Sequence, residues 1–88
     1  MSQAQIKALR KKLKKLDAEV EKRREGVETI ALALEGRIPS KAERAAFRRG
    51  LERRRESLAE ALAAREAVAR QIVALQEQRK EEVRRAKA

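Results

Sequence analysis

The chain has 88 residues, of which 24 are Lys or Arg and 14 are Asp or Glu, so its formal net charge is +10. It contains no Cys and no His, which excludes disulfides, thiolate metal sites and histidine-dependent catalysis. With 43% charged residues and one aromatic residue, the composition is typical of long helices or a coiled coil. The length allows one domain, residues 1–88, and the basic balance favours partners with negative surfaces.

The first predicted helix extends from about residue 2 to residue 35. Its apolar residues recur at alternating spacings of three and four, a heptad repeat that predicts a left-handed coiled-coil contact. The nine positions of this repeat are Ile6, Leu9, Leu13, Leu16, Val20, Arg23, Val27, Ile30 and Leu34. Arg23 is the one basic residue among them.

The segment Gly36–Ser40 is the strongest turn signal in the chain. Gly36 is expected to end the first helix as a cap in the left-handed conformation, and Pro39 disfavours helix at Ile38. Ser40 and Glu43 form a capping box that predicts the start of the second helix. A turn this short makes the two helices antiparallel neighbours.

The second predicted helix extends from about residue 41 to residue 86, with residues 77–88 polar enough to fray except at Val83. It is longer than the first helix, so the arms are unequal. The predicted fold is therefore all-α: a two-helix antiparallel coiled-coil hairpin that associates with a second copy into a four-helix bundle. In this architecture it resembles the two-helix protomers of small four-helix bundles.

The position of the turn gives a first estimate of the register. If the turn is centred near Ile38, the numbers of facing residues sum to about 75, so Leu16 lies opposite Leu58. Gly26 then lies beside Gly50. Two glycines at one level indicate a close approach of the helices, or else two glycines tolerated on exposed faces.

Self-association is predicted from apolar residues that one partner helix cannot cover. Those of the second helix span a wide arc, and Leu32 falls at an outward position of the first. The predicted dimer interface consists of Leu32, Val68, Ile72, Val73 and Leu75. The alternative is a monomer with an apolar surface.

No catalytic, cofactor or metal site is predicted. The hydroxyl residues have no His partner, and carboxylate pairs such as Glu21 and Glu25 lie among Lys and Arg, where solvated ion pairs are the simpler interpretation. The three glycines are isolated, so there is no phosphate-binding loop. We therefore expect a protein that is not an enzyme and has no small-molecule substrate.

The basic residues predict contact with an anionic partner, with charge richest near the middle of the hairpin, where residues 22–24 would face residues near 51–53. This pattern suits phosphate-backbone binding without sequence readout, whereas the simpler interpretation is a solvated helix surface. The lack of aromatic residues for stacking argues against single-strand readout. The predicted binding residues are Lys11, Lys12, Lys15, Arg24, Arg44, Arg48, Arg49, Arg53, Arg54 and Arg55.

Arg23, Arg54 and Arg65 fall inside the apolar stripes of the two helices. Their stems could pack on the seam while their head groups reach solvent or a nearby Glu. They could instead form a polar layer that fixes the register or oligomeric state. A third interpretation is an anion site where Arg23 approaches Arg54.

Two functional hypotheses follow. The first is a self-associating basic hairpin that contacts nucleic-acid phosphates or a nucleoprotein. The second is a protein–protein interaction module (an adaptor, chaperone, scaffold or inhibitor, of a kind small phage and plasmid proteins often provide) that docks a partner through its apolar face. Binding to a membrane surface through residues 6–16 is disfavoured because that stretch has no interfacial aromatic residue. No apolar run approaches the ~20 residues of a transmembrane helix, and residues 6–16 do not form the apolar region of a signal peptide. The expected location is therefore cytoplasmic.

Overall fold

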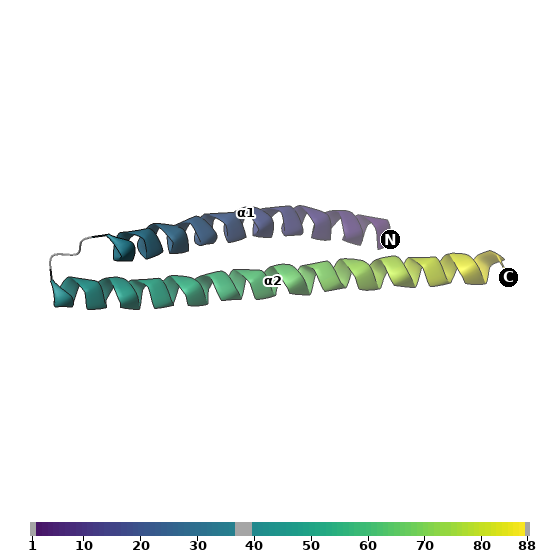
Figure 1. Cartoon of the computed structure of the whole chain (residues 1–88). Coiled ribbons are helices and arrows are strands. Elements are labelled where there is room, and N and C mark those ends of the chain that lie inside the picture. Colours follow the sequence, from purple (N-terminus) through teal and green to yellow (C-terminus); the bar gives the residue numbers. More distant parts are fainter. Residues whose placement is uncertain (1, 37–39, 88) are drawn as a thin grey trace.

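In the computed structural model, which describes residues 2–36 and 40–87, the chain forms a hairpin of two long helices (Figure 1). Helix α1 extends over Ser2–Glu35 and helix α2 over Lys41–Lys87. They lie side by side and antiparallel, and the hairpin is a rod of 72 × 15 × 15 Å. The predicted all-α hairpin with unequal arms is confirmed, and α2 stays helical to Lys87 where the sequence predicted fraying.

The end of α1 and the start of α2, on the two sides of the turn, are held by different hydrogen bonds. At the start of α2, the Ser40 hydroxyl accepts a hydrogen bond from the Glu43 amide at 3.2 Å, which confirms Ser40 as the helix cap. At the end of α1, the Gly36 amide donates to the Ala33 carbonyl at 3.3 Å, and Gly36 does not have a positive φ. The predicted left-handed cap at Gly36 is therefore wrong, because a tightened last turn ends the helix instead. The predictions for Ile38 and Pro39 lie outside the described residues.

The heptad seam of α1 is the face that packs against α2. All nine of its predicted positions are buried or half-buried, with Ile6 and Val20 the most buried of them. On α2 the buried residues are Leu51, Ala61, Val68 and Ile72. The largest cluster, near the open end of the hairpin, is made by Ile6, Val68 and Ile72 with Leu9, Leu13, Leu16 and Leu75 packed around them. Each large side chain buried here contributes about 1.5–3 kcal/mol to folding.

This packing corrects the predicted dimer interface. Val68 and Ile72 are only 4% and 8% exposed, and Leu75 packs against the same cluster. These three residues were assigned to a second copy, but α1 already covers them. Leu32 and Val73 are 67% and 55% exposed, so they alone of the predicted set remain on the surface.

The register also differs from the prediction. Arg23 bonds to Ser57, Arg54 bonds to Gly26, and a Cβ on Gly50 would contact Ile30. The numbers of facing residues thus sum to about 80, which displaces one helix by roughly 7 Å relative to the estimate made from the turn. Gly26 and Gly50 consequently lie on different levels, about one turn apart, and the predicted glycine pair is wrong.

Within the described residues, neither helix contains a stretch that is both long and apolar enough to cross a membrane.

Candidate phosphate-binding surface

Charge is unevenly distributed along the rod once the register is known. The open end, formed by residues 2–15 and 65–87, holds thirteen basic and four acidic residues, a net charge of +9. The middle, residues 16–24 and 56–64, holds three basic and five acidic residues, a net charge of −2. The turn end, residues 25–36 and 40–55, holds seven basic and five acidic residues.

This distribution overturns the expectation that positive charge is richest near the middle. In the observed register Arg23 reaches Ser57, so residues 22–24 face the acidic stretch around Glu56 and Glu60. They do not face the arginines near residue 53. The positive potential is therefore strongest at the open end, where the two chain segments furthest from the turn meet.

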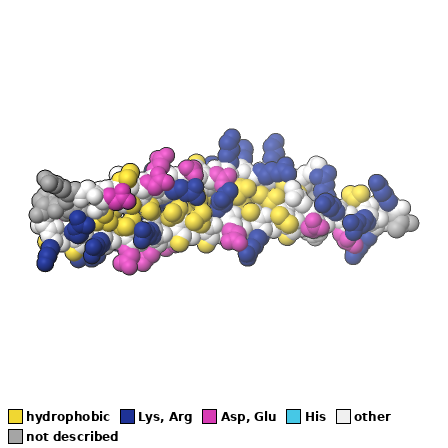
Figure 2. Space-filling model, in the orientation of Figure 1, with side chains coloured by type: hydrophobic (Ala, Val, Ile, Leu, Met, Phe, Trp, Pro, Cys, Tyr) yellow, Lys and Arg dark blue, Asp and Glu magenta, His cyan; other side chains and the backbone are white. Residues whose placement is uncertain are grey.

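The first half of α1 supplies the densest part of the basic open end. Residues 2–16 include six basic and no acidic residues. All six side chains are exposed, namely Lys7, Arg10, Lys11, Lys12, Lys14 and Lys15. Because they occupy five of the seven heptad positions, they surround the helix on every side except its buried seam. Figure 2 shows basic side chains on this part of α1 and acidic side chains nearer the turn.

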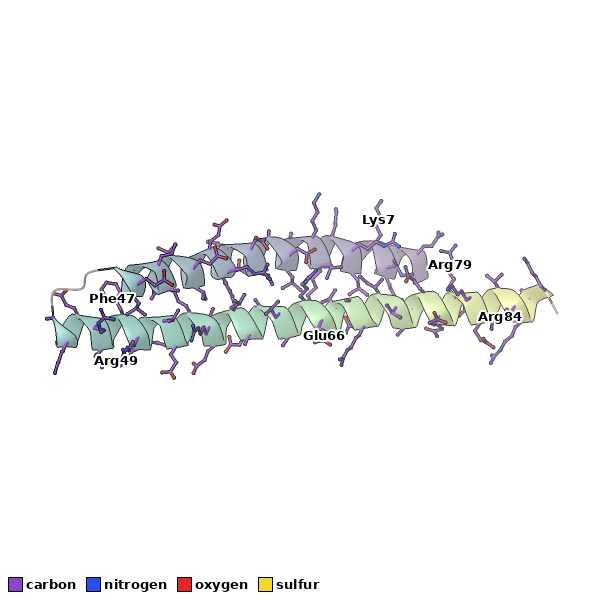
Figure 3. All side chains as sticks on the ribbon, in the orientation of Figure 1. Lys7, Phe47, Arg49, Glu66, Arg79 and Arg84 are labelled. Carbon is purple, nitrogen blue, oxygen red and sulfur yellow. The ribbon has the colours of Figure 1, made fainter. Side chains whose placement is uncertain are left out.

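A groove of about 950 Å³ lies between the helices at the open end. Its lining contains five basic residues and no acidic residue: Gln3, Ile6, Lys7, Arg10, Gln76, Arg79, Lys80, Val83 and Arg84. Figure 3 places Lys7 on α1 and Arg79 on α2 at this end. With its amide oxygen turned toward the guanidinium, Gln3 accepts from both Arg79 nitrogens at 2.8 and 2.6 Å, which links the helices across the groove without neutralising Arg79.

The basic residues of the groove are only weakly neutralised by neighbouring acids. Lys80 and Arg84 pair with Glu77 and Glu81 at 3.8 Å, and all four side chains are more than half exposed. Exposed ion pairs with this separation contribute little to the free energy of folding, and salt screens them further. Among the described residues, no acidic side chain lies within ion-pair distance of Lys7 or Arg10. A phosphate approaching this end therefore meets cations that have no strong competing partner.

The middle of the rod differs, because five of its eight charged side chains take part in ion pairs: Asp17, Glu19, Glu21, Arg23 and Arg24. Where the middle meets the open end, Asp17 on α1 pairs with Arg65 on α2. Arg24, one of the predicted binding residues, pairs with Glu21 at 3.2 Å. This zone therefore contributes to the stability of the hairpin and offers little attraction to an anion.

Two arginines cross between the helices and bond to the backbone. Arg23 donates from Nη1 to the Ser57 carbonyl at 2.7 Å, and its Nε bonds to Glu19 at 2.9 Å. Arg54 donates from Nη1 to the Gly26 carbonyl at 2.9 Å. We call Arg23, Gly26, Arg54 and Ser57 the arginine clasp. Its two bonds are reciprocal, one in each direction between the helices.

The contacts of Arg23 and Arg65 agree with the first interpretation of the seam arginines, because their head groups reach the acidic residues Glu19 and Asp17. The head groups of Arg23 and Arg54 also bond to carbonyls of the opposite helix, and a polar layer of this kind would favour one register of the hairpin. Gly26 provides the space, because a Cβ there would lie 3.3 Å from Nη1 of Arg54. The small hollow of about 250 Å³ beside the clasp is lined by Lys22, Arg23 and Arg54 together with Glu19, which bonds to Arg23.

Apart from Arg24 in the middle, the predicted binding residues divide between the two ends of the rod. Lys11, Lys12 and Lys15 are exposed at the open end. Arg48, Arg49, Arg53 and Arg55 are exposed at the turn end, whereas Arg44 and Arg54 point toward carbonyls of α1. The prediction left out Arg79, Lys80 and Arg84, which the fold brings to the same end as Lys7 and Arg10. Only the register could have shown that these two segments meet.

No three acidic side chains of residues 2–36 and 40–87 gather closely enough to hold a metal ion. Comparison of the chain with protein-family models, with curated proteins and with solved structures finds no match. Function is therefore argued from the charge and geometry of the surface.

Proposed function

We propose that the chain is a non-enzymatic binding protein that contacts the phosphates of nucleic acid, free or within a nucleoprotein, through its basic open end. The observation that carries this proposal is the concentration of a net charge of +9 at one end of a rod whose middle is net negative. Phosphate contacts from Lys and Arg supply affinity without depending on base sequence.

The same surface supports binding without sequence readout. The one aromatic residue, Phe47, lies at the turn end, so no ring is available at the open end to stack on a base. Lys dominates on α1, and its ammonium acts as a point charge, whereas bidentate recognition requires Arg. Affinity should consequently depend on the density of phosphates far more than on the identity of the bases.

The expected salt dependence follows from the number of cations that can reach one duplex. If six of the thirteen basic residues of the open end each neutralise one phosphate of the same duplex, the slope of log K against log salt is about −5. We expect mixed-sequence duplexes to bind with similar affinity at ~50 mM salt and to lose roughly three orders of magnitude by 200 mM. Fluorescence anisotropy with labelled duplexes measures both quantities.

A matched pair of variants identifies the end that binds. The variant K11Q/K12Q/K15Q removes three charges from the open end and should reduce the slope by about 2–3 units. The variant R48Q/R49Q/R53Q removes the same charge from the turn end and should change the slope far less. Absent or salt-insensitive binding of the unmodified protein contradicts the proposal. An equal decrease of the salt slope in the two variants also contradicts it.

A second candidate function, a protein–protein interaction module, is favoured by a different observation. Leu62, Val73 and Val83 of α2 are 38%, 55% and 47% exposed, so they could contact an apolar surface of a partner. A protein partner held by these side chains should remain bound at 1 M salt, where phosphate contacts are lost. Replacement of Val73 by Ser should then release it.

A further inference from the structure

One side of the hairpin differs from the other in both charge and hydrophobicity. The groove at the open end defines this side, since Lys7 of α1 and Lys80 and Val83 of α2 line it together. In a coiled coil, residues seven apart lie on the same side of the pair, so the side can be followed toward the turn by counting in sevens. We call it the groove side.

On α2 the groove side carries the exposed apolar residues. Counting back from Val83 gives Gln76, Ala69 and Leu62, and counting back from Lys80 gives Val73, Glu66, Ala59 and Glu52. All three large apolar side chains exposed on α2 away from the turn therefore lie on one side. A helix that packs on one partner needs a single apolar seam, so this second set indicates a second contact.

On α1 the groove side carries a row of charges whose sign changes half-way. The row consists of Lys7, Lys14, Glu21, Glu28 and Glu35, spaced by seven residues, and all five are exposed. Within the part of the chain that the structure describes, Lys7, Lys14, Glu28 and Glu35 have no ion-pair partner. Figure 2 shows the same change along α1, from acidic side chains near the turn to basic ones near the open end.

This row is complementary to itself when it is reversed. If two copies of α1 lie antiparallel with Glu21 at the centre, Lys14 faces Glu28 of the second copy and Lys7 faces its Glu35. The central Glu21 is already bonded to Arg24 of its own helix at 3.2 Å, which reduces repulsion between the two Glu21 residues. In a parallel pair, by contrast, Lys would face Lys and Glu would face Glu.

We infer that the groove side is the site of self-association, and that its occupant is a second copy of the chain in antiparallel orientation. A two-fold axis perpendicular to the rods makes each cross-chain ion pair occur twice, which gives four pairs in the dimer. The same operation brings Leu62 and Val73 of α2 to the interface, whereas Val83 extends past the start of α2 in the second copy. It also places Glu66 opposite Glu52 of the second copy, and Glu66 is already paired with Arg70 of its own helix at 2.6 Å. The product is a four-helix bundle that keeps Val73 from the interface predicted from sequence but not Val68, Ile72 or Leu75, which pack within the hairpin.

This inference does not depend on phosphate binding. Lys11, Lys12 and Lys15 occupy other heptad positions than Lys7 and Lys14, so they remain exposed in the dimer. Variants of one set therefore test self-association, and variants of the other test phosphate binding.

Sedimentation equilibrium on the full chain at ~50 mM salt tests the inference. The unmodified protein should reach twice its mass of 10.0 kDa as concentration rises. The variants K14E and E28K each replace two attractive pairs with two repulsive ones, and each should weaken association by about tenfold or more. The double variant K14E/E28K restores opposite charges across the two-fold axis, and its association should return to within a few-fold of the unmodified protein.

The variant K11E provides the matched control, because it makes the same change of charge three residues from Lys14 but outside the row. It should alter association far less than K14E. Circular dichroism confirms that each variant remains helical, as expected for exposed positions. The inference is overturned if the unmodified protein stays monomeric up to millimolar concentration, if the double variant associates no better than the single ones, or if K11E is as harmful as K14E.

Discussion

The arginine clasp makes opposite predictions for two glycines that look equivalent in the sequence. Gly26 and Gly50 both lie in the interior of a long helix, where Ala is favoured over Gly by about 1 kcal/mol. A Cβ on Gly50 would lie 3.6 Å from Cδ1 of Ile30, an ordinary van der Waals contact. The variant G50A should therefore raise the free energy of unfolding by about the full 1 kcal/mol.

At Gly26 the new methyl group meets the clasp. Its Cβ would lie 3.3 Å from Nη1 of Arg54, so the guanidinium must move by a few tenths of an ångström. That nitrogen donates to the Gly26 carbonyl at 2.9 Å, and a hydrogen bond of this kind contributes about 0.5–1.5 kcal/mol net. The helix-propensity gain of G26A should be mostly or wholly cancelled, which leaves it near zero or slightly destabilising.

Urea unfolding followed by circular dichroism at one fixed protein concentration measures both variants. A double-mutant cycle separates the two contributions, because in an R54A background the obstructing guanidinium is absent. There, G26A should recover its gain of about 1 kcal/mol, with a coupling energy of similar size to the lost hydrogen bond. If G26A stabilises the unmodified chain as much as G50A does, the clasp has no energetic role and the reasoning is refuted.

Three further predictions concern the packing, the ion pairs and the cap. The variant I72A should lower the free energy of unfolding by about 2–4 kcal/mol because it opens a cavity at the core cluster. The variant L32A, at a residue that is 67% exposed, should change it by less than about 0.5 kcal/mol, and similar losses from both would contradict the burial pattern. The variant D17N, which removes the ion pair to Arg65, should lower the free energy of unfolding by at most about 1 kcal/mol, since both side chains are nearly half exposed. In thermal melts at 1 M salt this difference between D17N and the unmodified chain should vanish. The variant S40A should lower stability by about 1 kcal/mol through loss of the helix cap, and an unchanged melting temperature would show that the cap bond is unimportant.

Phosphate binding and self-association compete for only part of the open end. Lys7 belongs both to the basic groove and to the charge row, so a dimer removes it from solvent. Lys11, Lys12 and Lys15 stay accessible, and an antiparallel dimer places one such set on each side of the two-fold axis. A dimer that binds phosphates would therefore have two sets of these lysines, one in each half of the bundle.

The secondary structure and the buried face of α1 could be predicted from the order of residues alone. Periodicity of three and four fixes which residues of a helix share one side, and this local geometry requires no knowledge of the partner. The seam from Ile6 to Leu34 was therefore predictable position by position, as were the cap at Ser40 and the exposure of Leu32. The charge of the chain was equally fixed, because composition does not depend on fold.

The alignment of the two helices along their length depends on contacts between them and could not be predicted from local pattern. Successive heptad layers are chemically similar, so sliding one helix past the other changes apolar packing little, and the turn alone misplaced the register by about five residues. Bonds that reach from Arg23 to Ser57 and from Arg54 to Gly26 distinguish one alignment from the others, because each requires a particular carbonyl at a particular level. That alignment then determines which charges share an end, buries Val68 and Ile72 within the hairpin, and makes the open end the most basic part of the molecule.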